Sequence, residues 1–200
     1  MAAVAASNNV QQLPEMPRYY PGSPYIVSHF LRANDRMLLN ELHPADAKTL
    51  EQVFRRNKQV AVHQMDAYQA MKAFLPPKER RGLVLIDPAY EQPNEYDLII
   101  DGATEGLRRW ETGVYAIWYP IKDKAITEKF LRKIKTRVNK ELLVTEMTIY
   151  SEILKSNLNG SGMLIINPPW QLDEKLNELV PWLWKVLSFD KQGGCRVEFL

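Results

Sequence analysis

Cysteine is nearly absent from this sequence, since Cys195 is the only one. An internal disulfide framework therefore cannot form, and such a chain suits a reducing compartment. Long apolar runs are also lacking, because none approaches the roughly 20 residues that a membrane-spanning helix needs. The segment from Met1 to Ala6 has no basic residues of the kind that open a signal peptide. These absences together predict a cytoplasmic protein.

Neither sign of charge dominates, because 26 Lys and Arg stand against 24 Asp and Glu for a net charge of +2. Overall charge therefore demands no nucleic-acid partner, although it leaves room for a local basic patch. The three histidines lack metal-ligand spacing, and no Gly-x-x-x-x-Gly-Lys phosphate loop occurs, so we expect neither a metal site nor a nucleotide triphosphatase. The composition predicts a loose lead-in at 1–18 and one domain over 19–200.

Short apolar runs alternate with helical patterns along the chain. Strands are expected at 37–42, 59–63, 83–86, 113–119, 141–150 and 162–166, with an edge strand at 196–200. Helices are expected from Pro24 and Pro44, at 67–75, 95–110 and 122–138, and beyond Trp170, and residues 151–160 are expected to form a polar loop. This alternation predicts an α/β fold, with a mostly parallel sheet and helices on both faces.

The third expected strand, 83–86, delivers Asp87, Pro88 and Tyr90 at its carboxyl end. Its continuous apolar run is typical of a strand buried on both faces, and open α/β sheets bind ligands at that end. The Asp87 carboxylate and the Pro88 carbonyl could accept hydrogen bonds from an adenine amine, and Tyr90 could stack on an extruded base. The alternative is a plain turn in which Asp87 caps the next segment and Tyr90 packs at the rim.

Three successive strands end in acids, namely Glu41, Asp66 and Asp87. On a parallel sheet these ends share one rim, so the three carboxylates are predicted to converge on one cavity. Glu41 would bind a ribose, and Asp66 would accept from an adenine amine. The alternative is that Glu41 and Asp66 only cap the helices that follow them.

The sequence Asn167-Pro168-Pro169-Trp170 competes with Asp87 as an amine-binding motif. Its strand is expected two or more places along the sheet from strand 83–86. Ligands bind where strand connections diverge, so position favours Asp87. We therefore interpret the 167–170 segment as a stiff turn into a helix.

The segment 122–140 is strongly basic and could attract phosphate groups. Lys129, Arg132, Lys133 and Arg137 form its predicted contact surface for RNA. The alternative for such a charge run is a solvated helix face.

Five motifs occur in order along the chain: Tyr-Tyr-Pro-Gly-Ser at 19–23, Glu-Leu-His-Pro at 41–44, Arg-Arg-Gly-Leu-x-Leu-Ile-Asp-Pro at 80–88, Gly-x-Tyr-Ala-x-Trp-Tyr-Pro at 113–120 and Ser-Gly-Met-x-x-Ile-Asn-Pro-Pro-Trp at 161–170. Together they closely resemble the large-subunit (23S) ribosomal RNA adenine-N6 methyltransferase J family, over about residues 18–187. The resemblance implies a class I methyltransferase fold and transfer of a methyl group from S-adenosylmethionine, without a metal, to the N6 amine of an adenine in ribosomal RNA.

The resemblance also implies roles for particular residues. Those expected to bind the donor are Ser23, Glu41, Asp66, Ala67 and Asp87, and those expected to act on the base are Asp87, Pro88 and Tyr90. Two positions depart from the family pattern, since Ala89 replaces the second proline of Asp-Pro-Pro-Tyr and Ala67 replaces a glycine.

The family's first strand, its glycine-containing loop and an N-terminal tail have no counterpart in these 200 residues. The chain is therefore expected to correspond to the later two-thirds of such an enzyme. Two alternatives remain open at this point: a truncated, non-catalytic module that binds nucleic acid or another partner, and a DNA adenine-N6 methyltransferase.

Overall fold

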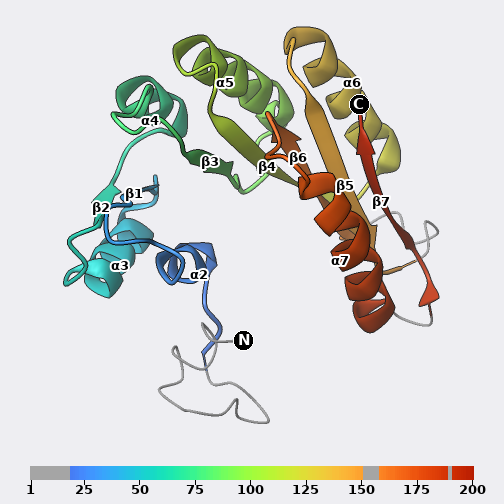
Figure 1. The fold of residues 1–200 in the computed structure, drawn as a ribbon, viewed down its shortest axis with the longest axis horizontal. Helices are drawn as coiled ribbons and strands as arrows, with labels where there is room; N and C mark the ends of the chain where they lie inside the picture. The colour runs from blue at the N-terminus through green and yellow to red at the C-terminus, as the bar shows by residue number, and fades with distance from the viewer. Residues whose placement is uncertain (1–18, 151–157, 189–190) are drawn as a thin grey trace. The chain divides into compact units, whose positions relative to one another are not determined.

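The computed structural model describes residues 19–150, 158–188 and 191–200, and these divide by their contacts into two units, one ending at Ala70 and the other beginning at Met71. Figure 1 labels the helices and strands of both units. The predicted lead-in at 1–18 and most of the predicted loop at 151–160 lie outside the described residues. Within the described ranges, no helix combines the length and apolar character required to cross a bilayer.

The first unit is built around two parallel strands. Its elements are α2 (Ser23–Ser28), β1 (Met37–Asn40), α3 (Pro44–Phe54), β2 (Val60–His63) and the start of α4 (Ala67–Phe74). β1 and β2 pair from Met37 with Val60 to Asn40 with His63. This register places the carboxyl ends of both strands, and the residues that follow them, at one edge of the small sheet.

The second unit holds a five-stranded sheet in the order β3-β4-β6-β5-β7. Its strands are β3 (Leu83–Ile86), β4 (Val114–Ile121), β5 (Leu142–Thr148), β6 (Gly160–Ile166) and β7 (Gly194–Phe199), and its further helices are α5 (Glu95–Arg109), α6 (Lys124–Arg137) and α7 (Leu172–Leu187). The α/β class is therefore as predicted.

The prediction of a mostly parallel sheet is wrong for this unit. Only the β3–β4 pair is parallel, and the pairs β4–β6, β5–β6 and β5–β7 are antiparallel. Only residues 149–159 join β5 to β6, and parallel neighbours need a crossover connection of about a dozen residues or more, so antiparallel pairing suits this short connection. The result is a mixed sheet.

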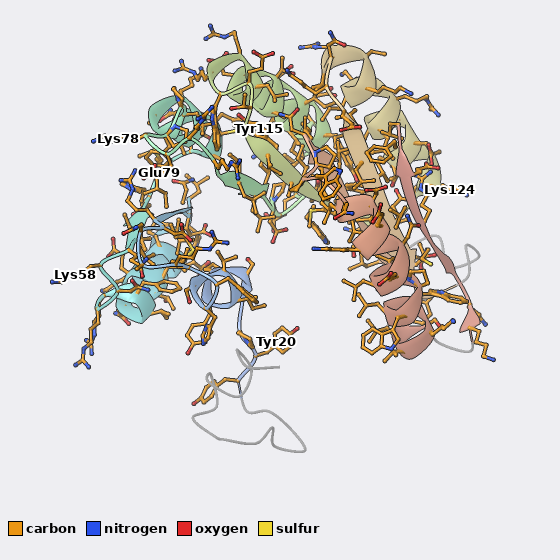
Figure 2. The ribbon with its side chains drawn as sticks, in the orientation of Figure 1. Tyr20, Lys58, Lys78, Glu79, Tyr115 and Lys124 are labelled. Atoms are coloured by element: carbon orange, nitrogen blue, oxygen red, sulfur yellow. The ribbon has the colours of Figure 1, made fainter. Side chains whose placement is uncertain are left out.

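Helices cover both faces of this sheet, as predicted (Figure 1). Along β4, Tyr115 and Tyr119 point to one face, where an added Cβ on Gly106 of α5 would lie 2.9 Å from the Tyr115 ring and where Tyr119 contacts Phe130 of α6. Figure 2 labels Tyr115 at this β4–α5 layer. Ala116 points to the other face, in a cluster that includes Leu172 of α7. Side chains alternate along a strand, so each face receives its own set.

Candidate functional site

Asp87 directly follows β3, which is an edge strand of the larger sheet. The prediction that β3 is buried on both faces is wrong, because Leu83 and Leu85 are 59% and 42% exposed while Val84 and Ile86 are half-buried. Val84 and Ile86 share the face of Tyr115 and α5, whereas nothing in the described part of this unit covers the two leucines. An edge strand covered on one face delivers Asp87 to an accessible position.

Asp87 is exposed as a residue, although protein atoms partly shield its carboxyl group from water, and it has no hydrogen-bond donor among the described residues. Burial raises its pKa above the ordinary aspartate value, and no nearby charge contributes to the shift. Removing water from a carboxylate disfavours its charged form unless a donor replaces the water. The site therefore offers a strong acceptor that a bound amine could satisfy. The predicted alternative, in which Asp87 caps the next segment, finds no supporting hydrogen bond.

Tyr90 is held in a strained backbone conformation close to Asp87. Its φ is +55°, in the left-handed region that bulky residues rarely adopt. Its hydroxyl donates to the Trp118 carbonyl at 2.6 Å, and its ring lies 5.0 Å from that of Tyr96 and 5.7 Å from that of Trp118 between centroids. Such strain persists only where surrounding contacts impose it, and it is typical of functional sites.

The Asn167-Pro168-Pro169-Trp170 segment lies at the other end of the sheet from Asp87. β6 is two places from β3 and runs antiparallel to β4, so its carboxyl end lies beside the start of β4. The Asn167 side-chain nitrogen donates to the carbonyls of Glu111 and Gly113 at 2.9 and 2.8 Å. The interpretation of this segment as a structural turn rather than an amine site is thereby supported.

Glu41 and Asp66 follow the neighbouring parallel strands β1 and β2, so they lie at the same edge of the first unit's sheet. Glu41 is half-buried, and its Oε1 accepts from the His43 backbone N–H at 2.8 Å. Asp66 caps α4, since its Oδ1 accepts from the N–H groups of Tyr68 and Gln69 at 3.0 Å each. Both acids therefore have local structural contacts, as the alternative predicted, and each leaves its second oxygen without a hydrogen bond from the described residues.

The other predicted donor-binding residues of the first unit are exposed. Ser23 is the first residue of α2, whose N-cap is Gly22, and Ala67 is the first residue of α4. Asp87, in contrast, belongs to the second unit. The convergence of Glu41, Asp66 and Asp87 on one cavity therefore remains a prediction.

Sequence reasoning missed Asn40, the last residue of β1. Its side-chain nitrogen donates to the Met65 carbonyl at 3.0 Å, while its Oδ1 is buried with no hydrogen-bond partner in the described part of the chain. A buried acceptor without a donor is costly, so this oxygen suits a hydrogen-bond donor from a ligand. The signal in the sequence was an amide side chain at a strand end, directly before Glu41.

The basic helix α6 is partly neutralised by its neighbour α5. Lys133 pairs with Asp97 at 2.6 Å, and Arg137 pairs with Asp101 at 2.9 Å. Lys129 and Arg132 are exposed and form no hydrogen bond or ion pair with the described residues. Figure 2 labels Lys124 at the start of the same helix. Of the four predicted contact residues, Lys133 and Arg137 are therefore paired with carboxylates of α5, whereas Lys129 and Arg132 are not.

The α/β fold with helices on both faces of a mixed sheet agrees with the methyltransferase class to which the matching family model belongs. The chain belongs to the family described as ribosomal RNA large subunit methyltransferase D, RlmJ, whose family model matches residues 4–200.

Two curated relatives carry the name ribosomal RNA large subunit methyltransferase J. The protein of Haemophilus influenzae is 42% identical and that of Escherichia coli 39% identical, each over 183 residues and 92% of this chain. A crystal structure of a Legionella pneumophila protein has a TM-score of 0.87 and 33% identity, and the match covers 98% of this chain and 71% of that one. The chain spans 65% of the length of either curated relative.

Proposed function

We propose that this chain forms the base-binding part, and one edge of the donor site, of an S-adenosylmethionine-dependent enzyme that methylates the N6 amine of an adenine in large-subunit ribosomal RNA. The observation that carries the proposal is the accessible Asp87 carboxyl group, which has no hydrogen-bond donor among the described residues and is followed by Pro88 and by the strained Tyr90. The names of the two curated relatives support the RNA substrate.

The adenine amine is a poor nucleophile, because its lone pair is delocalised into the ring. Hydrogen bonds from its two N–H groups to the Asp87 carboxylate and the Pro88 carbonyl would turn the lone pair away from the ring and towards the methyl group. Fixed acceptors that are already in position need no rearrangement during the reaction. The absence of a competing donor leaves the Asp87 oxygens available for this purpose.

Tyr90 would hold the extruded base by stacking. Its ring is anchored by the hydroxyl bond to Trp118 and by contacts with Tyr96 and Trp118. An anchored ring loses little conformational freedom when a base stacks on it, which favours binding. The backbone strain at Tyr90 fits a ring whose orientation matters to function.

S-adenosylmethionine, when bound, supplies the electrophilic methyl group. Residues of the first unit fit its hydrogen-bonding groups, because its ribose hydroxyls and its adenine amine need acceptors. Glu41 and Asp66 each have an oxygen without a described partner, and the buried Oδ1 of Asn40 lacks a donor. Ser23 and Ala67 are proposed to border the donor, and Asp87 to lie beside its methyl group.

The RNA itself would contact α6 through Lys129 and Arg132, with Lys133 and Arg137 contributing less because each is paired with a carboxylate of α5. A basic helix contacts phosphates without reading sequence, so this surface would position the RNA rather than select the nucleotide.

The test compares wild-type chain with Asp87→Ala in a tritiated-methyl transfer assay on deproteinised ribosomal RNA. We expect the initial rate to fall by at least about 10²-fold, because a fixed electrostatic contact to the reacting group is lost. Glu178→Ala on α7 is the control, because Glu178 is exposed and pairs with none of the proposed RNA-contact residues, and it should retain the wild-type rate. Unchanged turnover in Asp87→Ala would refute the assignment.

Two further measurements address the alternatives. Equal or faster transfer to duplex DNA than to ribosomal RNA would identify a DNA methyltransferase instead. Calorimetry with S-adenosylmethionine should give saturable binding, and a wild-type chain that binds RNA but never the donor would be a non-catalytic module.

A further inference from the structure

Trp118 is an aromatic residue of the second unit that anchors Tyr90 and also presents its own ring beside the candidate site. It belongs to β4, is half-buried, and lines a cavity of about 150 Å³. Met163 of β6, Thr145 of β5, and Val180 and Leu183 of α7 also line this cavity. A cavity of about this volume is large enough to admit a single aromatic ring. The indole is therefore not backed by close packing on that side.

The strand register brings Asp87 level with Trp118. Leu85 pairs with Ala116 and Ile86 pairs with Ile117 in the parallel β3–β4 ladder. One position further along, β3 is followed by Asp87 and β4 reaches Trp118. Neighbouring positions of adjacent strands point to the same face, about 5 Å apart. Continuing this register by one position would place Asp87 next to Trp118, with both side chains directed to the α7 face of the sheet.

Tyr90 joins the same group of residues from the loop. Its ring meets the Trp118 ring at an interplanar angle of 64° with 5.7 Å between centroids, and its hydroxyl bonds to the Trp118 backbone at 2.6 Å. Two aromatic planes at this angle form a corner. A planar base can lie flat against one plane while its edge meets the other.

We propose that Trp118 forms the second aromatic wall of the acceptor-base site, set at an angle to the wall that Tyr90 provides, and that the cavity which the indole lines gives it room to turn as the base enters. The inference rests on the proposed function, because it concerns the same adenine. It assigns a positioning role to Trp118: the indole holds the base in the plane that directs its amine to Asp87. The cavity explains why so large a ring is left partly unpacked beside a functional loop.

A purely structural role for Trp118 predicts a different outcome. If the indole only fills space, its removal should lower stability without changing affinity for a free base. The matched control is Trp170, which is 87% exposed and follows β6 at the other end of the sheet. Trp170→Leu removes an indole from the same unit without touching the site.

The test is a fluorescence titration of the full chain with 2-aminopurine riboside, an adenosine analogue whose emission is quenched when it stacks on an aromatic ring. Wild-type chain, Trp118→Leu, Trp118→Phe and Trp170→Leu are compared, and a thermal melt of each variant reports folding. We expect Trp118→Leu to weaken binding by about tenfold or more, because one of the two aromatic contacts of the base is lost. Trp118→Phe, which keeps a flat ring, and Trp170→Leu should stay within about threefold of wild type.

Wild-type affinity in a folded Trp118→Leu, or no saturable quenching by the wild-type chain, would overturn the inference. A loss of affinity in Trp118→Phe equal to that in Trp118→Leu would also overturn it, because a flat ring would then not suffice. The titration needs no methyl donor, so its result is distinct from the methyl-transfer assay. Methyl transfer that depends on Asp87 while base binding ignores Trp118 would leave the proposed function intact and remove only this inference.

Discussion

Among single residues, Asp87 is distinguished by the surroundings of its carboxyl group. Its carboxyl group is partly withdrawn from water and receives no compensating hydrogen bond from the described residues, so burial raises its pKa. Folding therefore makes the ionised form of this carboxyl group less favourable than in a free aspartate, and hydrogen bonds from a bound amine would favour that form again. Binding sites commonly carry such a cost in the free protein.

The raised pKa predicts both a pH profile and a stability effect. Methyl transfer needs the ionised acceptor, so activity should fall as pH decreases through a midpoint above the ordinary aspartate pKa. An acid whose pKa is raised on folding loses stability as pH rises through that value. Asp87→Asn should therefore be at least as stable as wild type at neutral pH, with the difference vanishing in acid. Rate–pH profiles and thermal melts over the same range would check both expectations. A destabilised Asp87→Asn at neutral pH would contradict them.

The sequence was sufficient to predict the acidic residues of the candidate site, but not all of the contacts around them. Asp87, Pro88 and Tyr90 could be singled out because an acid and a proline interrupt an apolar run. The anchoring of Tyr90 to Trp118 could not be predicted, because it joins residues 28 positions apart through a backbone carbonyl. The unpaired Oδ1 of Asn40 could not be predicted either, because the hydrogen-bond partners of a side-chain atom depend on the folded structure.

At the scale of elements, the C-terminal strand β7 is held to the sheet by a charged cluster around Arg196. The guanidinium bonds to Glu146 of β5 at 2.6 Å, to Glu128 of α6 at 3.0 Å and to Glu198 at 2.7 Å. Tyr119 of β4 donates to the other oxygen of Glu146 at 2.7 Å. This cluster, defined by these five side chains, connects three strands and one helix.

Removing Arg196 should destabilise the second unit strongly. Arg196→Ala leaves Glu146, whose side chain is only 14% exposed, without its cationic partner. Breaking such a partly buried pair typically costs about 3 kcal/mol of unfolding free energy. Arg137→Ala is the control, because the Arg137–Asp101 pair is exposed and should give no measurable change. Denaturant unfolding of both variants measures the difference. Equal stabilities would show that the cluster does not hold β7.

Gly162 tests the packing of the face that α6 covers. An added Cβ there would overlap the Tyr119 ring, which is buried and fixed by its hydrogen bond to Glu146. Gly162→Ala should therefore cost about 2 kcal/mol or more, because the ring cannot move aside. Gly194→Ala in β7 is the matched control, since a Cβ there meets nothing within 4 Å, and its stability should change by less than about 0.5 kcal/mol. A tolerated Gly162→Ala, measured in the same unfolding assay, would mean that the Tyr119 layer is loosely packed.

Most elements could be predicted from periodicity, while their directions could not. Strand β3 was predicted with its observed bounds, and α5 and α6 within two residues of theirs. β4 was expected to close before Pro120, yet it continues to Ile121. Pro120 lies beyond Ile117, the last residue paired with β3, so its missing N–H leaves no acceptor of β3 unpaired. The antiparallel half of the sheet escaped prediction, because apolar runs do not encode the direction in which a strand is paired.

At the scale of the whole molecule, the distribution of charge over the surface says more about a nucleic-acid partner than the net charge does. The overall charge is only +2, but α6 carries exposed cations on the face opposite α7. Lys133 and Arg137 are engaged by Asp97 and Asp101, which concentrates the available positive charge on other residues of the helix. The proposed RNA-contact surface is thus narrower than the sequence predicted.

Lys129→Gln combined with Arg132→Gln should weaken binding to ribosomal RNA and reduce its salt dependence. Each lost phosphate contact lowers the slope of log affinity against log salt by about 0.7 to 0.9. Lys175→Gln with Lys185→Gln on α7, at the opposite face of the sheet, is the matched control of equal charge change. Filter-binding isotherms at several salt concentrations measure both effects. An equal loss in the two double variants would assign the effect to general charge rather than to α6.

The central claim is that Asp87 holds the exocyclic amine of an adenine for methylation. Its most direct test is mass spectrometry of nucleosides from large-subunit ribosomal RNA, digested after incubation with the chain and S-adenosylmethionine. The account predicts N6-methyladenosine with the wild-type chain and none above background with Asp87→Asn. A methyl group on any other atom, no methylated adenosine from the wild type, or an equal yield from Asp87→Asn would contradict it.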